Sequence, residues 1–148
     1  MNPMVALDTH YRAQATTAAV LFEKWSDAIP LACQISHCQE VGEYRSGSFF
    51  LRELPSLLQA LKNLEPSLIV VDGYVHLGQS PGLGWHLYQA LGQKCPIIGV
   101  AKNPYRSAPG IPLFRGSSTR PLFLSALGVD EQQAARWVGS MHGTHRIP

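Results

Sequence analysis

Two aspartates follow hydrophobic segments of the kind that forms buried β-strands. Asp8 comes after Val-Ala-Leu, and Asp72 comes after Ile-Val-Val. Ligand sites of open α/β sheets gather at strand ends, so these two side chains meet if their strands are neighbours. Two close carboxylates repel each other, and a bound divalent cation removes that repulsion. Magnesium suits such a site because it prefers oxygen ligands and takes one or two carboxylates. The alternative is that each aspartate only caps a turn.

A third carboxylate and a lysine are candidates for the same site. Glu53 lies in Phe-Phe-Leu-Arg-Glu-Leu-Pro, where a helical pattern begins, and could supply a third metal ligand. Lys102 ends the hydrophobic segment Pro-Ile-Ile-Gly-Val-Ala-Lys. Its ammonium group could neutralise a phosphate or the charge that develops in a transition state. The alternative for Lys102 is a solvated strand end without a chemical role.

Other residue types that often do chemistry show no informative spacing. The six histidines contain no HxxxH pair, and the three cysteines contain no CxxC pair. The sequence therefore indicates neither a zinc site nor a disulfide framework. The glycines of Gly82-Leu-Gly84 lack the full spacing of a phosphate-binding loop.

The elements expected to position these residues alternate between strands and helices. Three early strands joined by short connections predict an antiparallel meander, and the next two hydrophobic strands each follow a helix, which predicts parallel pairing. Expected strands cover 4–8, 16–25, 31–41, 68–73, 95–102, 113–114 and 120–125, and expected helices cover 54–64 (or an earlier start with a kink at Pro55), 82–91 and 129–141. The pattern predicts one domain over residues 1–148, an α/β fold with a mixed sheet and helices on both faces.

Charge is divided unevenly along the chain. Residues 1–74 carry five basic and eight acidic side chains, whereas residues 75–148 carry seven basic and two acidic side chains. A cationic second half beside an acidic first half suits a polyanion that is held near a metal. The alternative is chance variation in surface charge.

No apolar run approaches the ~20 residues that a membrane span needs. The segment before Asp8 is also too short, and lacks the cationic start, for a signal peptide. We therefore expect a cytoplasmic protein that does not enter a membrane.

Six short stretches, in order along nearly the whole chain, resemble motifs of the endonuclease V family. They are an aspartate–tyrosine motif, a tyrosine wedge leading into an Arg-Glu pair, an aspartate–glycine motif, a Gly-Leu-x-x-His-Leu stretch, an Ile-Gly-Val-Ala-Lys strand and an aromatic-Arg-Leu-Pro-like stretch. In this sequence they are Asp8–Tyr11, Tyr44–Pro55, Val71–Gly73, Gly82–Leu87, Pro96–Lys102 and His145–Pro148.

The resemblance implies a ribonuclease H-like fold and a metal-dependent endonuclease. Family members cut DNA or RNA one phosphodiester past a deaminated base, inosine above all, on its 3′ side. Asp8, Glu53 and Asp72 would carry over as ligands of Mg²⁺, with Mn²⁺ as a possible substitute, and Lys102 would carry over as an active-site lysine.

The resemblance also implies residues that recognise nucleic acid. Tyr44, in the same turn as Gly47, would be the wedge that fills the gap where the damaged base leaves the helix. Gly73, Gly82 and His86 would help to form the base pocket. Unstacking a base costs only a few kcal/mol at a mispaired position, and an aromatic ring can replace the lost stacking.

The sequence departs from the family pattern at several places. The wedge has Arg45 and Ser46 where the family has prolines, and no arginine follows Asp72-Gly73 in the usual position. We expect a chain that is shortened at both ends relative to the family. Because of these departures, a second hypothesis is that the protein is a relative of the family that binds nucleic acid without cutting it. A third reading is an unrelated α/β protein that holds a phosphorylated small molecule.

Overall fold

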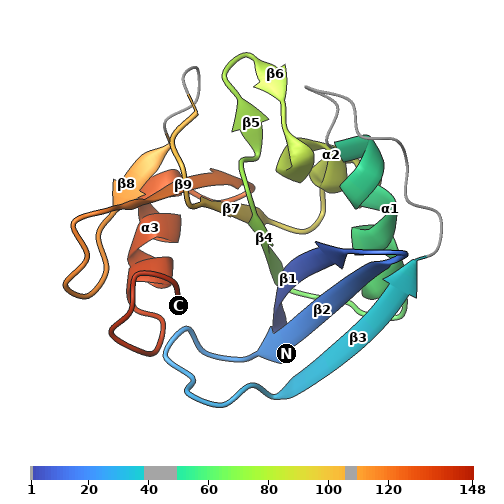
Figure 1. Ribbon diagram of the computed structural model, residues 1–148, viewed down its shortest axis with the longest axis horizontal. Helices are drawn as coiled ribbons and strands as arrows, with labels where there is room; N and C mark the ends of the chain where they lie inside the picture. The colour runs from blue at the N-terminus through green and yellow to red at the C-terminus, as the bar shows by residue number, and fades with distance from the viewer. Residues whose placement is uncertain (1, 39–49, 106–109) are drawn as a thin grey trace.

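The protein contains one large mixed sheet between two layers of helix (Figure 1). The computed structural model describes residues 2–38, 50–105 and 110–148. In these residues, the strands are β1 (Met4–Tyr11), β2 (Ala15–Phe22), β3 (Ala32–Cys38), β4 (Leu68–Asp72), β5 (His76–Leu77), β6 (Ser80–Pro81), β7 (Ile97–Ala101), β8 (Ile111–Leu113) and β9 (Leu122–Leu127). The helices are α1 (Phe50–Leu61), α2 (Leu83–Ala90) and α3 (Glu131–Gly139).

The large sheet has the strand order β3-β2-β1-β4-β7-β9-β8. The first three strands form an antiparallel meander, and β4 pairs parallel to both β1 and β7. Strand β9 then pairs antiparallel with β7 and β8. The predicted mixed sheet, with a meander followed by parallel strands, is confirmed. Its centre consists of β1, β4 and β7, the three strands that carry the candidate site.

The side chains of the central strands point alternately to the two faces of the sheet, and this divides the core into two layers. Val5, Leu7 and Val71 pack with helices α1 and α2 on one face. Ala6 and Val70 point to the opposite face, which α3 covers. Because successive side chains of a strand point to opposite faces, every second residue of β1 and β4 belongs to the same layer. The prediction of helices on both faces is confirmed.

The helices begin and end where their sequences allow. Asp130 precedes α3 and accepts a hydrogen bond from the backbone N–H of Gln133 at 3.0 Å, as an N-cap residue does. Helix α1 begins at Phe50 and contains Pro55, so the earlier of the two predicted starts is correct. None of the helices in the described part of the chain is long and apolar enough to cross a membrane.

Several elements differ from the prediction. Strand β2 covers Ala15–Phe22 rather than 16–25, for example. Strand β1 continues to Tyr11, because Thr9–Tyr11 still pair with β2 after the pairing with β4 has ended. The short β5–β6 ladder was not predicted, since two-residue strands carry no alternating pattern. Strand β8 covers Ile111–Leu113 rather than the predicted 113–114, and β9 starts and ends two residues later than predicted.

Candidate active site

Asp8 and Asp72 lie side by side on neighbouring strands. The parallel register pairs Leu7 of β1 with Val71 of β4, so the next residue on each strand is one of the two aspartates. Both aspartates are exposed. Strand β4 ends at Asp72, and β1 loses its parallel neighbour at the same level. The predicted meeting of these two carboxylates at the carboxyl edge of the sheet is therefore present, although Asp8 lies within β1 rather than at its end.

The two aspartates and Lys102 line one small pocket on the α3 face of the sheet. The pocket has a volume of about 180 Å³. Its walls come from three central strands and from the segment after α3: Ala6, Leu7, Asp8, Val70, Val71, Asp72, Val100, Lys102, Met141, Ile147 and Pro148. The floor is apolar and the rim is charged. Such a pocket favours electrostatic contacts because the apolar wall excludes part of the surrounding water.

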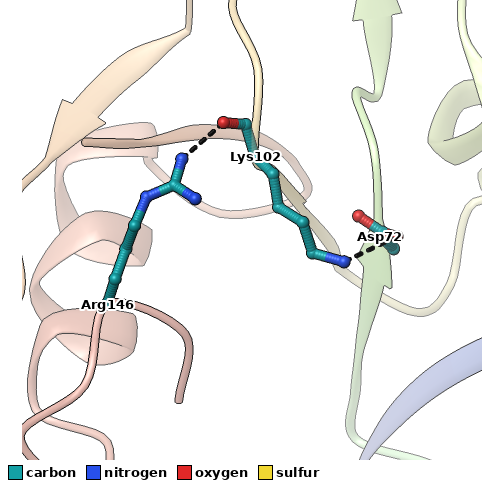
Figure 2. Close-up of polar contacts among 3 residues, drawn as sticks. All are labelled: Asp72, Lys102 and Arg146. Carbon is teal, nitrogen blue, oxygen red and sulfur yellow. Dashed lines mark hydrogen bonds and ion pairs between the residues drawn. The ribbon is translucent and has the colours of Figure 1, made fainter. Parts of the chain in front are cut away.

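Lys102 follows the last residue of β7 and points toward Asp72 (Figure 2). Its Nζ atom lies 3.5 Å from Oδ2 of Asp72, and the two side chains are 47% and 45% exposed. An ion pair this exposed contributes only ~0–1 kcal/mol to stability. The Lys102–Asp72 ion pair therefore adds little to the stability of the fold. Its consequence for the site is that the Lys102 ammonium lies beside the two carboxylates.

Glu53 belongs to the helix layer on the opposite face of the sheet from this pocket. It lies in the first turn of α1, the helix that packs on the Leu7 and Val71 side. Glu53 is only 6% exposed, with its Oε2 atom buried, and it does not line the pocket of Asp8 and Asp72. Within the described ranges, no group of three His, Cys, Asp or Glu side chains is placed to hold a metal ion. The role of Glu53 as third ligand stays a prediction.

The segment after β4 is held on the α1–α2 side by close backbone contacts. The N–H groups of Gly82 and Trp85 both donate to the carbonyl of Val75, at 3.0 and 3.1 Å. A Cβ atom at Gly82 would lie 2.6 Å from the carbonyl oxygen of Tyr74, a distance that real side chains do not reach. Gly82 is thus required for packing, and its weak resemblance to a phosphate loop has a structural explanation.

Gly73 is required for a different reason from Gly82, namely its backbone conformation rather than close packing. Its φ of +121° lies in a region that L side chains rarely adopt, yet a Cβ atom there would meet nothing within 4 Å. Its N–H group donates to the carbonyl of Val100 at 3.0 Å. The backbone of Gly73 is therefore held in place next to Asp72, and the side of Gly73 where a Cβ atom would lie is open.

His86 lies on α2 near the same segment. It is half-buried, its ring is 5.1 Å from the Trp85 ring in an edge-on arrangement, and burial lowers the pKa of its imidazole. Tyr44 and Gly47, the two residues predicted for the wedge, lie outside the described residues.

Sequence reasoning missed two residues that support the segment after β4. The Oγ atom of Ser125 on β9 accepts a hydrogen bond from the buried N–H of Val75 at 3.1 Å. A Cβ atom at Gly99 would lie 2.5 Å from the carbonyl oxygen of Gly73. These contacts join positions more than 20 residues apart, so no local pattern could have indicated them.

Sequence reasoning also missed two arginines that hold the segment after α3. The guanidinium of Arg115, 5% exposed, donates to the carbonyls of His145 at 2.6 Å and Met141 at 2.7 Å. Burial lowers the pKa of Arg115. Arg146, in the segment itself, donates to the carbonyls of Lys102, Arg120 and Pro121. The end of the chain is thus fixed over the pocket by side-chain-to-backbone hydrogen bonds.

The family model for endonuclease V matches residues 2–135 of the chain. Among curated proteins, the endonuclease V of Streptomyces coelicolor is 36% identical over 129 residues. That match covers 82% of this chain and 52% of the relative, so the chain spans about half the length of the curated protein it matches.

Solved structures of the same family superpose on the whole chain. The crystal structure of endonuclease V from Streptomyces avermitilis is 30% identical, with a TM-score of 0.76, and the match covers 100% of this chain and 75% of that one. The endonuclease V of Ciona intestinalis, solved with a DNA that contains an inosine followed by a ribo-adenosine, has a TM-score of 0.77 at 21% identity and covers 99% and 80%. These matches confirm the ribonuclease H-like fold.

Proposed function

Because the chain belongs to the endonuclease V family, we propose that it is a metal-dependent endonuclease that hydrolyses a phosphodiester near a deaminated base, inosine above all, in DNA or RNA. The observation that carries the proposal is the pocket where Asp8, Asp72 and Lys102 lie together at the carboxyl edge of the sheet. Support for the substrate comes from the Ciona relative, which was solved with inosine-containing DNA.

The donor atoms in this pocket fit a hard divalent cation. Asp8 and Asp72 present carboxylates on adjacent strands, both exposed. Magnesium keeps several waters and binds through one or two carboxylates plus substrate phosphate, so two protein ligands are sufficient. Asp8 and Asp72 would hold Mg²⁺ or Mn²⁺, and Glu53 would contribute from α1. Such an ion, when bound, polarises a phosphoryl oxygen and makes water a better nucleophile at neutral pH.

The residues of the chain bind and orient the substrate in this proposal. The Lys102 ammonium lies 3.5 Å from Asp72 at the rim of this pocket. It would neutralise negative charge on a phosphate bound at the same rim. The apolar floor formed by Val70 and Val100 excludes water from one side of that phosphate. The cationic second half of the chain attracts the rest of the nucleic-acid backbone.

The segment after β4 is the proposed site of base recognition. Gly73 offers an open backbone face beside Asp72, and Gly82 fixes the neighbouring turn. His86 lies on the helix that follows this turn, and its lowered pKa keeps the imidazole neutral at neutral pH. A neutral imidazole both donates and accepts hydrogen bonds, as reading a base edge requires. Tyr44 and Gly47 would complete this surface.

The experiment is cleavage of end-labelled oligonucleotides that differ at one base. DNA and RNA strands with a single inosine are compared with strands that carry guanosine there, in Mg²⁺ and in excess chelator. We expect one cut on the 3′ side of inosine, lost in chelator and absent from the guanosine strands. Folded protein that cuts no inosine strand above the chelator background contradicts the proposal.

A second candidate is a family member that binds nucleic acid without cutting it. The position of Glu53 outside the pocket of Asp8 and Asp72 favours it. The departures from the family motifs at Arg45, at Ser46 and after Gly73 favour it too. It predicts salt-dependent binding of the oligonucleotides, no cleavage, and unchanged affinity in Asp8→Asn. Loss of affinity when Mg²⁺ is removed would argue against this candidate.

A further inference from the structure

Arg146 joins the end of the chain to two strands beside the pocket. Its guanidinium donates to the carbonyl of Lys102, which follows β7, and to the carbonyls of Arg120 and Pro121, which precede β9. The distances to Arg120 and Pro121 are 3.0 and 2.9 Å. Figure 2 shows that Arg146 reaches the backbone of Lys102 from one side, while the Lys102 side chain extends to Asp72 on the other.

The sequence explains why an arginine is needed at this place. The antiparallel pairing of β7 and β9 ends at Ala101 and Phe123. Pro121 lies just beyond, and it has no N–H to continue the ladder. Lys102 and Pro121 both lie beyond the paired residues of β7 and β9, and the Arg146 guanidinium donates to the carbonyls of both. A guanidinium suits this task because its donors are arranged in a rigid planar fork.

The consequence concerns the direction of the Lys102 side chain. The Lys102 side chain is 47% exposed and the residue lies just outside β7, so side-chain packing does not fix where the ammonium points. The backbone on either side is held, at Ala101 by pairing with β9 and at Asn103 by the Tyr74 hydroxyl. A lysine side chain is flexible and ends in a single ammonium group. The position of that ammonium therefore depends on where the lysine backbone is held. The hydrogen bond from Arg146 is the described contact that holds the carbonyl of this residue.

We propose that Arg146 is a positioning residue, which acts through the Lys102 backbone to keep the Lys102 ammonium beside Asp72. The proposal rests on the proposed nuclease function for its kinetic consequence. It assigns no contact between Arg146 and substrate, since two of its nitrogens already donate to three carbonyls. Arg115 independently holds the same segment at Met141 and His145, so the chain end stays in place when the Arg146 side chain is shortened.

The test is a double-mutant cycle with Arg146→Met, Lys102→Met and the double variant. The single-turnover cleavage rate and KM are measured on the inosine oligonucleotide. We expect Arg146→Met to lower the rate by about 10- to 100-fold, as loss of an outer partner of an active-site group does, with KM changed less than about threefold. In the Lys102→Met background, the same substitution should change the rate by less than about twofold, because nothing remains to be positioned.

Additive effects of the two substitutions would overturn the proposal, as would a change confined to KM, which would indicate direct binding of substrate. If Arg146→Met fails to fold, Arg146→Lys completes the cycle. It keeps a donor for the Lys102 carbonyl but loses the fork, and a smaller rate loss is expected.

A second readout separates this inference from the proposed function. The lysine side chains are ¹³C-methylated, and the NMR signal missing from Lys102→Met identifies Lys102. In Arg146→Met we expect this signal to move toward those of Lys24, Lys62 and Lys94, which are exposed. An unchanged Lys102 signal contradicts the inference even if the protein cuts DNA. A shifted signal in a protein that cuts nothing leaves the positioning intact and removes the nuclease function.

Discussion

On the α3 side of the sheet, Asp8, Asp72 and Lys102 are exposed around a small pocket. On the α1–α2 side of the same edge, the backbone after β4 packs so closely at Gly82 and Gly99 that neither position has room for a Cβ atom. The first region concentrates charges whose contacts contribute little to stability. The second contributes shape, because close backbone packing fixes one conformation. Substitutions on the two sides should therefore differ in their effect on stability. Those around the pocket should lower activity with little change in the free energy of unfolding, whereas those in the closely packed segment after β4 should lower the free energy of unfolding.

The strongest test of this separation is Asp72→Asn. Loss of one of the two carboxylates proposed to bind the metal should lower the cleavage rate by about 10³-fold or more, or about 4 kcal/mol of transition-state stabilisation. The free energy of unfolding should change by less than ~1 kcal/mol, since only an exposed ion pair is removed. Rates and urea unfolding are measured on the same preparations. Glu65→Gln, an exposed carboxylate at the opposite edge, is the control and should alter neither quantity.

Gly99→Ala tests the other side. Its Cβ atom would lie 2.5 Å from the carbonyl oxygen of Gly73 and 2.8 Å from Oγ of Ser125. We expect a loss of about 1–3 kcal/mol in unfolding free energy, as overpacked cores show. Gly139→Ala at the end of α3 is the matched control, since a Cβ there meets only a side-chain atom at 3.3 Å. Equal stability of the two variants would show that the packing around Gly99 can relax to accept a Cβ atom.

Ser125→Ala removes one hydrogen bond from the same enclosed segment. The buried N–H of Val75 would lose its acceptor, which should cost about 1–2 kcal/mol of unfolding free energy. Chemical denaturation measures this loss, with Ser67→Ala as a control on an exposed serine. A neutral Ser125→Ala would show that another group can accept from Val75, and that the segment is less constrained than its contacts indicate.

The smallest expected effect is a pH dependence of stability that involves His86. Burial lowers the pKa of His86 below its usual 6.5, so the unfolded chain takes up a proton at higher pH than the folded protein does. The contribution of His86 should therefore be fully present above about pH 6.5 and decrease as the pH falls toward the folded-state pKa. Urea titrations from pH 7.5 to 5 should show a shallower decline in His86→Gln than in the wild type. Identical slopes would contradict this.

The sequence predicts the part of the site that lies directly after apolar strands. Asp8 and Asp72 follow apolar runs, and the parallel pairing of two such runs brings the residues after them to one level. Lys102 comes directly after the apolar strand β7, and the parallel pairing of β7 with β4 brings it to the same edge of the sheet. Glu53 was predicted as a carboxylate near a helix start, and it lies in the first turn of α1. Which face α1 covers depends on tertiary packing, so the sequence could not place Glu53 relative to the pocket.

The remainder depends on contacts between distant positions. Gly82 resembled a weak phosphate loop, whereas its backbone packs against Tyr74 and Val75. Arg146 carried no signal beyond a short motif, because its partners lie 25 to 44 residues earlier and are backbone carbonyls, which any residue can supply. Side-chain-to-backbone hydrogen bonds of this kind leave no recognisable pattern of residue types in a single sequence.

Asp8 and Asp72 lie together at the carboxyl edge of the sheet, where we propose that they bind a divalent cation. Electron paramagnetic resonance of free Mn²⁺, titrated with the protein in the absence of nucleic acid, measures this binding directly. The account predicts that the wild type removes Mn²⁺ from solution, that excess Mg²⁺ releases it, and that Asp8→Asn and Asp72→Asn each weaken binding at least about tenfold, whereas Glu65→Gln does not. Equal binding by wild type and both variants, or no binding by any of them, would contradict the account.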